Sequence, residues 1–216
     1  MTEIRGFGSD NQSGVHPDVL AALEAANGGH AVGYGADSQT VALDEVVRHR
    51  FGTQAVGFPV FGGTGANVVA LAALTGRWQA VACADVAHVN TDEGAAPEHA
   101  AGVKLVPVPA PGGKITTDAL AEVLADRQTV HQSALRVLSL TQASELGTVY
   151  TPDEIATLAD LAHAHGLLVH VDGARLANAA ATLGASLADV SLAAGADVVC
   201  VGGTKNGLAF GELVVT

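Results

Sequence analysis

Three short segments of the sequence contain residue types that could do chemistry, and each directly follows an apolar run typical of a buried strand. The first is the glycine-rich turn at residues 62–65 (GGTG), the second is residues 172–175 (DGAR), and the third is Lys205, which lies within GGTKNG. In sheets of parallel strands, ligands bind at the carboxyl ends of the strands. We therefore expect these three segments to meet at one edge of a sheet.

The glycine-rich turn could bind a phosphate. The small residues Gly63, Thr64 and Gly65 let the backbone close on an anion, and the free amides of the helix that follows favour negative charge. A dinucleotide fingerprint is one alternative, with Asp85 as its acidic residue after the next strand. Its third glycine position is occupied by Val68, so the fingerprint fails. A tight turn with no ligand is the other alternative.

The aspartate and the lysine complete a set of groups that one cofactor needs. Taken separately, Asp172 and Arg175 could be only an ion pair at a helix start, and Lys205 only a solvated turn residue. Lysine is rare here, however, since the others are Lys104 and Lys114. A lysine in a low-dielectric cleft can form a Schiff base with an aldehyde. A phosphate cradle, a carboxylate and an amine together match pyridoxal 5′-phosphate, which offers a phosphate, a pyridine nitrogen and an aldehyde.

The elements that must position these groups alternate along the chain. Short apolar runs alternate with helical patterns, which predicts an α/β fold with a mostly parallel sheet and helices on both faces. The predicted strands are residues 55–61, 80–84, 104–108, 136–141, 167–171, 197–201 and 212–215. The predicted helices are residues 17–26, 38–51, 64–74, 117–126, 152–165, 174–183 and 186–194. Prolines in and after residues 104–108 favour an edge position for that strand.

The composition is that of a folded, acidic protein. Of the 216 residues, 49% are hydrophobic and 15% are charged, which excludes a disordered chain. The net charge of −12 argues against a basic face for nucleic acid or for anionic lipid. No apolar stretch approaches the length of a membrane span, and no metal site is predicted.

We expect one domain over residues 1–216, with an N-terminal arm of about residues 1–30. Cys83 and Cys200 lie in apolar runs and are expected to be buried thiols, which favours a reducing cytoplasm; the sequence also begins without an apolar signal segment. Because residues 212–215 resemble a strand that no helix follows, we expect the chain to be cut short.

Six motifs give the sequence a resemblance to a known family. They are GSDNQSGVHP (8–17), FPVFGGTGANVVAL (58–71), AHVNTDEGAAPE (87–98), TQASELGTVYTP (141–152), HVDGARLANA (170–179) and GGTKNG (202–207). In these motifs and their order, the sequence resembles the low-specificity L-threonine aldolases and the phenylserine aldolases. These enzymes belong to the β-eliminating lyase group of fold-type I pyridoxal-phosphate enzymes. The resemblance covers nearly the whole chain and implies the large, cofactor-binding domain of that fold. On this resemblance we expect the chain to lack the family's smaller C-terminal domain, which supplies a further arginine.

The resemblance implies a cofactor role for the following five residues and for His88. Lys205 resembles the lysine that holds pyridoxal phosphate covalently. Asp172 resembles the carboxylate that pairs with the pyridine nitrogen and keeps it protonated. Gly63, Thr64 and Gly65 match the turn that binds the phosphate.

The resemblance also implies a substrate site. His88 resembles the histidine that stacks on the cofactor ring, and Arg175 and Ser9 resemble groups that bind the substrate carboxylate. His131 matches a second histidine near the substrate hydroxyl, and either histidine could be the base. Tyr34 is expected to reach the site of a neighbouring subunit, since sites in this family lie at subunit interfaces of a homodimer or homotetramer.

The implied reaction is retro-aldol cleavage of a β-hydroxy-α-amino acid to glycine and an aldehyde. Two histidines favour this reaction, because it needs a base at the β-hydroxyl. The alternatives are β-elimination by a related lyase, an inactive truncated fragment, and a nicotinamide-dependent dehydrogenase, which Val68 and Lys205 disfavour. Gln12 and residues 38–39 differ from relatives that carry larger or aromatic residues there, so the preferred side chain stays open.

Overall fold

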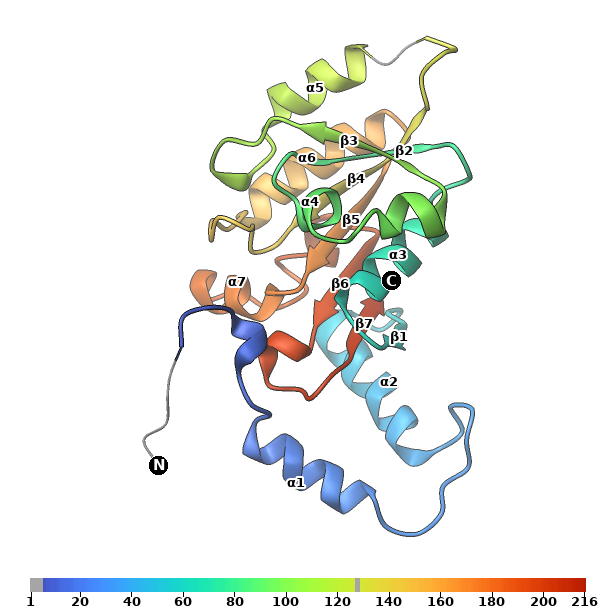
Figure 1. Cartoon of the computed structure of the whole chain (residues 1–216), viewed down its shortest axis with the longest axis vertical. Coiled ribbons are helices and arrows are strands. Elements are labelled where there is room, and N and C mark those ends of the chain that lie inside the picture. Colours follow the sequence, from blue (N-terminus) through green and yellow to red (C-terminus); the bar gives the residue numbers. More distant parts are fainter. Residues whose placement is uncertain (1–5, 127–128) are drawn as a thin grey trace.

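The computed structural model describes residues 6–126 and 129–216, and its centre is a seven-stranded sheet of order β1-β7-β6-β5-β4-β2-β3 (Figure 1). The five strands from β6 to β3 run parallel, while β7 and β1 are antiparallel additions at one side. The strands are β1 (Gly57–Val60), β2 (Ala80–Ala84), β3 (Lys104–Val108), β4 (Leu135–Thr141), β5 (Leu168–Gly173), β6 (Val198–Gly202) and β7 (Glu212–Val215). The fold is therefore α/β with a mostly parallel sheet, and β3 lies at an edge as its prolines indicate.

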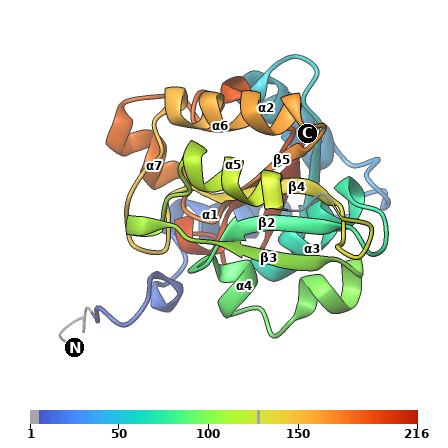
Figure 2. The same ribbon diagram turned by 90° about the horizontal axis from the view of Figure 1, so that it is seen from above.

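Helices cover both faces of this sheet. The α-helices of the described residues are α1 (Pro17–Ala26), α2 (Ser38–Phe51), α3 (Gly63–Leu74), α4 (His88–Thr91), α5 (Thr117–Asp126), α6 (Pro152–Ala164) and α7 (Leu176–Leu183). Seen from above, α3 and α4 lie on one side of the strands and α6 and α7 on the other (Figure 2). Every residue of β2 is buried, as expected for a strand covered on both faces. Both cysteines, Cys83 and Cys200, are free and buried.

The packing of α3 on the sheet rests on small residues. Ala66 and Ala70 on this helix are fully buried and pack against Val198, Cys200 and Val214 of β6 and β7. Alanine lets the helix approach the strands closely, because its side chain occupies so little space. The start of α3 is thereby held against the carboxyl ends of the central strands.

Local signals in the sequence explain where several helices begin. Thr151 caps α6 through a capping box, in which its side chain accepts a hydrogen bond from Glu154 N while the Glu154 carboxylate accepts one from Thr151 N. Asp37 caps α2 by accepting hydrogen bonds from the backbone of Gln39 and Thr40. These starts agree with the predicted ones.

The predicted helix at 186–194 is wrong. The segment forms turns and one short 3-10 helix, Leu192–Ala194. A reciprocal pair of hydrogen bonds, Ser186 N to Asp189 Oδ2 and Asp189 N to Ser186 Oγ, holds a turn at its start. The preceding helix also begins later than predicted, at Leu176, because Arg175 has a non-helical backbone. The Ser186–Asp189 pair explains the missing helix, because polar side chains that hydrogen-bond to the nearby backbone compete with helix formation.

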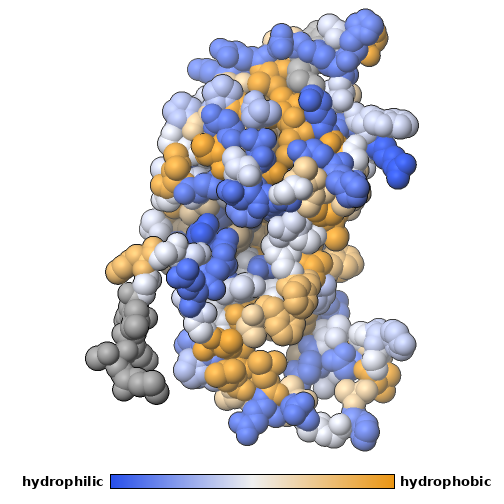
Figure 3. Space-filling model, viewed as in Figure 1, coloured by the Kyte–Doolittle hydropathy of each residue, from blue (hydrophilic) through white to orange (hydrophobic). Residues whose placement is uncertain are grey.

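The N-terminal segment crosses the carboxyl edge of the sheet and then extends away from it (Figure 1). The His16 backbone N–H donates to Gly207 O at 2.9 Å, which anchors this segment to the β6–β7 loop. Within the described chain no residue of α1 is buried, and Leu20 and Leu23 are each about half exposed. Figure 3 shows the resulting apolar patches at the lower end of the molecule. No helix among the described residues is long and apolar enough to cross a membrane.

Candidate active site

A pocket at the carboxyl ends of the central strands brings the three chemical segments together. It lies between the start of α3, the start of α4, the end of β5 and the loop after β6. Its lining residues are Gly63, Thr64, Asn67, His88, Glu93, Thr141, Glu145, Asp172, Ala174, Arg175 and Lys205. This position is where ligands bind in open α/β sheets.

The start of α3 offers unpaired backbone donors. Its N-cap is Gly62, which has no side chain to satisfy the N–H groups of the first turn. A Cβ atom added at Gly62, Gly63 or Gly65 would meet nothing within 4 Å, so the space beside this turn is open. An anion can therefore approach the positive end of the helix dipole.

Asp172 lies at the end of β5 and is only 5% exposed. Its Oδ1 accepts a hydrogen bond from Ala174 N at 3.1 Å, and its Oδ2 accepts one from Asn67 Nδ2 at 2.9 Å. Both carboxylate oxygens are thus held, and the carboxylate has a fixed orientation at the floor of the pocket.

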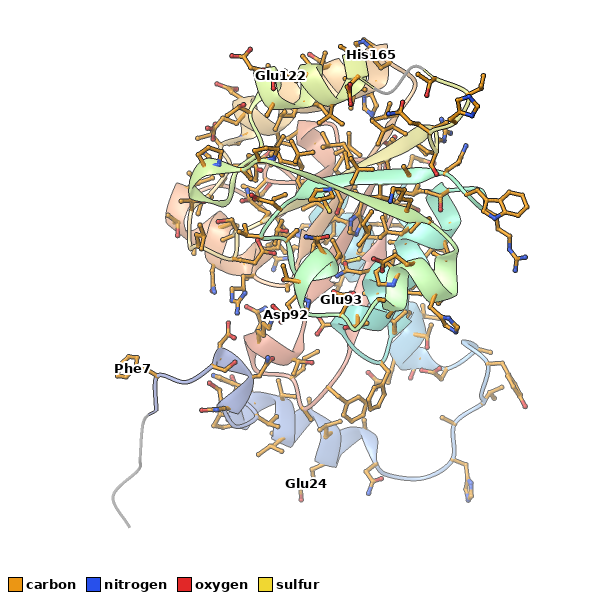
Figure 4. The ribbon with its side chains drawn as sticks, turned by 45° about the horizontal axis from the view of Figure 1, so that its top comes forward. Phe7, Glu24, Asp92, Glu93, Glu122 and His165 are labelled. Carbon is orange, nitrogen blue, oxygen red and sulfur yellow. The ribbon has the colours of Figure 1, made fainter. Side chains whose placement is uncertain are left out.

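A second carboxylate, Glu93, orients the histidine of the pocket. Glu93 follows α4 and lies beside it in Figure 4. Its Oε1 is 2.9 Å from His88 Nδ1 and 2.8 Å from Asn67 Nδ2. Because a carboxylate oxygen accepts, Nδ1 of His88 carries the proton and Nε2 is left for other contacts. The His88 backbone N–H donates to Glu145 Oε1 at 2.7 Å, which fixes the start of α4.

Arg175 binds a carboxylate through two nitrogens. Its Nε and Nη2 donate to Asp10 Oδ2 and Oδ1 at 2.6 and 3.0 Å. This hydrogen bonding raises the pKa of Arg175 and lowers the pKa of Asp10. The charge of nearby Lys205 also lowers the pKa of Asp10. The Arg175 side chain is therefore already arranged in the fork that recognises a carboxylate.

Lys205 lies on a tightly held 3-10 turn between β6 and β7. The Gly203 N–H donates to Glu212 Oε2 at 2.6 Å, and Asn206 Nδ2 donates to Gly202 O at 2.8 Å. A Cβ at Gly203 would collide with the carbonyl oxygen of Gly211, so only glycine fits there. Close backbone packing thus fixes the place of the lysine.

A buried polar row lies beneath the pocket, on the strand that carries Asp172. His170 is fully buried, with Nδ1 2.9 Å from Ser139 Oγ on β4 and Nε2 3.3 Å from Cys200 Sγ on β6. Burial lowers the pKa of His170 to about 4, although the charge of Asp172 opposes this shift. The histidine is therefore neutral at physiological pH.

The profile of the beta-eliminating lyases matches residues 6–216 of the chain. The chain belongs to the beta-eliminating lyase family. It is 45% identical to the low-specificity L-threonine aldolase of Pseudomonas aeruginosa over 97% of its own length, and 30% identical to that of Saccharomyces cerevisiae over 87%. A solved structure of the Leishmania major threonine aldolase superposes on 96% of the chain with a TM-score of 0.90 at 30% identity.

The chain spans only part of these beta-eliminating lyases. It covers 61% of the P. aeruginosa protein, 48% of the S. cerevisiae protein and 60% of the L. major chain. The threonine aldolase resemblance and the α/β fold expected from the sequence are both confirmed.

Most of the predicted site residues of the chain meet at the pocket. Gly63, Thr64, His88, Asp172, Arg175 and Lys205 line it. Gly65 lies in the first turn of α3 without lining the pocket. Ser9 precedes Asp10, and its hydroxyl accepts a hydrogen bond from Asn11 N, so it lies near Arg175 through its neighbour. Tyr34 is fully exposed and does not line the pocket of its own chain.

His131 does not line this pocket of its own chain. It is exposed in the turn before β4, whereas the pocket lies after β4 and β5. Since β4 has seven residues, about 20 Å of strand separates the two ends. The residue belongs to the opposite edge of the sheet.

Four polar residues of the pocket were not predicted, namely Asn67, Glu93, Thr141 and Glu145. Each lies inside a quoted family motif, at 58–71, 87–98 and 141–152. The sequence could have indicated Asn67, because it follows the predicted site residue Thr64 by three positions and therefore lies on the same face of the helix. Glu93 and Glu145 lie in irregular segments, where periodicity gives no direction to a side chain.

Proposed function

We propose that this chain is the pyridoxal 5′-phosphate-binding domain of a lyase that cleaves β-hydroxy-α-amino acids to glycine and an aldehyde. The observation that carries this proposal is the meeting of Lys205, Asp172 and the glycine start of α3 in one pocket. The relatives named threonine aldolase support threonine as a substrate. We propose that the substrate class also includes allo-threonine and phenylserine types.

The residues present fit this cofactor. The open, uncapped start of α3 suits a phosphate, and the nearly buried Asp172 carboxylate suits a protonated ring nitrogen. Lys205 supplies the amine for the aldehyde. When bound, pyridoxal phosphate withdraws the electrons of the breaking Cα–Cβ bond into its ring.

The chain's own residues would bind and orient the substrate. The Arg175 guanidinium, which in this structure binds Asp10, is proposed to bind the substrate carboxylate, with Ser9 beside it. A bidentate contact fixes the rotation of the amino acid, and thus which bond to Cα stands perpendicular to the ring. The substrate carboxylate would replace Asp10 on the guanidinium, because Asp10 occupies both of its donors.

His88 is proposed to cover the ring face and to move a proton at the β-hydroxyl. Its Nδ1 is engaged by Glu93, so Nε2 is the nitrogen that would accept a proton. Glu93 would stabilise the charge that His88 then gains, as an orienting carboxylate does for a general base. His131 has no part in this proposal, because it lies at the other edge of the sheet.

We also propose that the protein works as a homodimer or homotetramer in the cytoplasm. The exposed apolar side of α1 and the fully exposed Tyr34 support contact with a second subunit, whose site Tyr34 would reach. The two free thiols support a reducing compartment.

The proposal is tested by adding pyridoxal phosphate, reducing with borohydride and mapping the modified peptide by mass spectrometry. A phosphopyridoxyl group on Lys205 is expected. Lys205→Ala should lose it together with aldehyde release, while Lys114→Ala is the control, since Lys114 pairs with Glu154 away from the pocket. A 2-oxo acid and ammonia as products would instead indicate β-elimination. Cofactor uptake without products would indicate an inactive fragment, and adduct formation on another residue would contradict the assignment.

A further inference from the structure

Asn67 joins the two carboxylates of the pocket through one amide. Its Nδ2 lies 2.8 Å from Glu93 Oε1 and 2.9 Å from Asp172 Oδ2. The side chain is 2% exposed, and Asp172 and Glu93 are themselves buried. These residues are far apart in the sequence, so the contact is made only by the fold.

The chemistry of the two partners fixes which way the amide points. Both partners are carboxylate oxygens, which accept hydrogen bonds, so the NH₂ group of Asn67 must face them. Its Oδ1 is then buried, and it has no partner among the described residues. An apolar residue would avoid that cost, but it would remove one hydrogen-bond donor from each of two buried carboxylates. The position is therefore built to donate.

The helix that carries Asn67 also carries the phosphate turn. Thr64 and Asn67 are three residues apart in α3 and lie on the same face of it. Thr64 lines the pocket at the helix start, and Asn67 holds Oδ2 of Asp172 one turn further along. One rigid helix thus sets the separation between the anion site and the aspartate.

The same amide reaches His88 through Glu93. Glu93 Oε1 contacts both Asn67 Nδ2 and His88 Nδ1, so the position of this oxygen determines the tilt of the imidazole. If Asn67 moved, Asp172 and Glu93 would both lose a fixed partner, and His88 would lose the fixed position of the carboxylate that holds it.

We propose that Asn67 is a positioning residue, which holds Asp172 against the pyridine nitrogen of the bound cofactor and, through Glu93, holds His88 against the ring. This inference rests on the proposed function. Asn67 acts through its two carboxylates, so its removal should alter how the protein recognises the ring nitrogen rather than the phosphate or the aldehyde.

The test compares two ligands by equilibrium titration of the cofactor-free protein. One is pyridoxal phosphate, and the other is its analogue in which the ring nitrogen is replaced by C–H. A charge-assisted hydrogen bond from the ring nitrogen to Asp172 should make the wild type prefer pyridoxal phosphate by about tenfold or more. Asn67→Leu should lose most of this preference. Asn90→Ala is the control. It removes from α4 an amide that donates to Asp85 O in the turn after β2, and it should keep the preference.

Each outcome decides between the two proposals. If Asn67→Leu weakens both ligands equally, its role is merely structural and the inference is overturned. If the wild type binds both ligands equally well, Asp172 does not recognise the ring nitrogen. The inference then fails, while the proposal that the chain binds pyridoxal phosphate is upheld. If the wild type binds neither, the proposed function itself fails. Should Asn67→Leu not fold, Asn67→Ser replaces it, since one hydroxyl can donate to only one carboxylate; an unchanged preference in that variant overturns the inference.

Discussion

Buried His170 should make the stability of this protein depend on pH well above the range in which carboxylates titrate. Its pKa falls from 6.5 in the unfolded chain to about 4 in the folded one, chiefly because it is fully buried. Below pH 6.5 the unfolded state therefore binds more protons than the folded state, and stability falls with pH until the folded pKa is reached. The loss reaches about 2 kcal/mol at pH 5 and about 3 kcal/mol below pH 4.

Urea unfolding at pH 7.5 and pH 5 measures this loss. Asp10 has a pKa below 3.8 in the folded state, because of its hydrogen bond to Arg175, so its stabilising effect is still complete at pH 5. The midpoint of wild-type unfolding should fall by about 1 M urea between the two pH values. His170→Gln, which cannot titrate, should lose most of this difference although it is less stable at pH 7.5.

Ser139→Ala is the matched control for His170→Gln. It removes a hydrogen-bond partner at 2.9 Å but keeps the titrating ring. It should be less stable than the wild type at both pH values and should retain the fall between them. The reasoning is refuted if His170→Gln and the wild type lose the same free energy of unfolding from pH 7.5 to pH 5.

Three further perturbations have expected outcomes. Arg175→Lys replaces a planar fork by a single ammonium, so the KM for the amino-acid substrate should rise about tenfold while kcat changes less, as steady-state kinetics would show. Gly203→Ala forces the lysine loop away from Gly211 O and should weaken pyridoxal phosphate uptake, followed by absorbance; uptake equal to wild type would contradict the close packing. Thr151→Ala removes the cap of α6 and should lower the free energy of unfolding in urea by about 1 kcal/mol, with uptake unchanged.

The sequence by itself determined the parts of this protein that depend on neighbouring residues. Apolar runs predicted β2, β3 and β7 with the bounds that the structure has, because a buried strand needs few signals beyond its own residues. The capping box at Thr151 predicted the start of α6 for the same reason. The motifs after the strands predicted Asp172 and Lys205 as partners, since parallel strands end at one edge.

Only the tertiary structure decided which side chains meet across long separations. The contact from Asn67 to Asp172 joins residues 105 positions apart, and the ion pair of Arg175 with Asp10 joins residues 165 apart. A motif match alone could not place His131, because it does not say at which end of a strand a loop residue lies. Periodicity gives each residue a face of its own element, but it does not give the neighbour across the pocket, because that depends on how α3, α4 and the strands pack together.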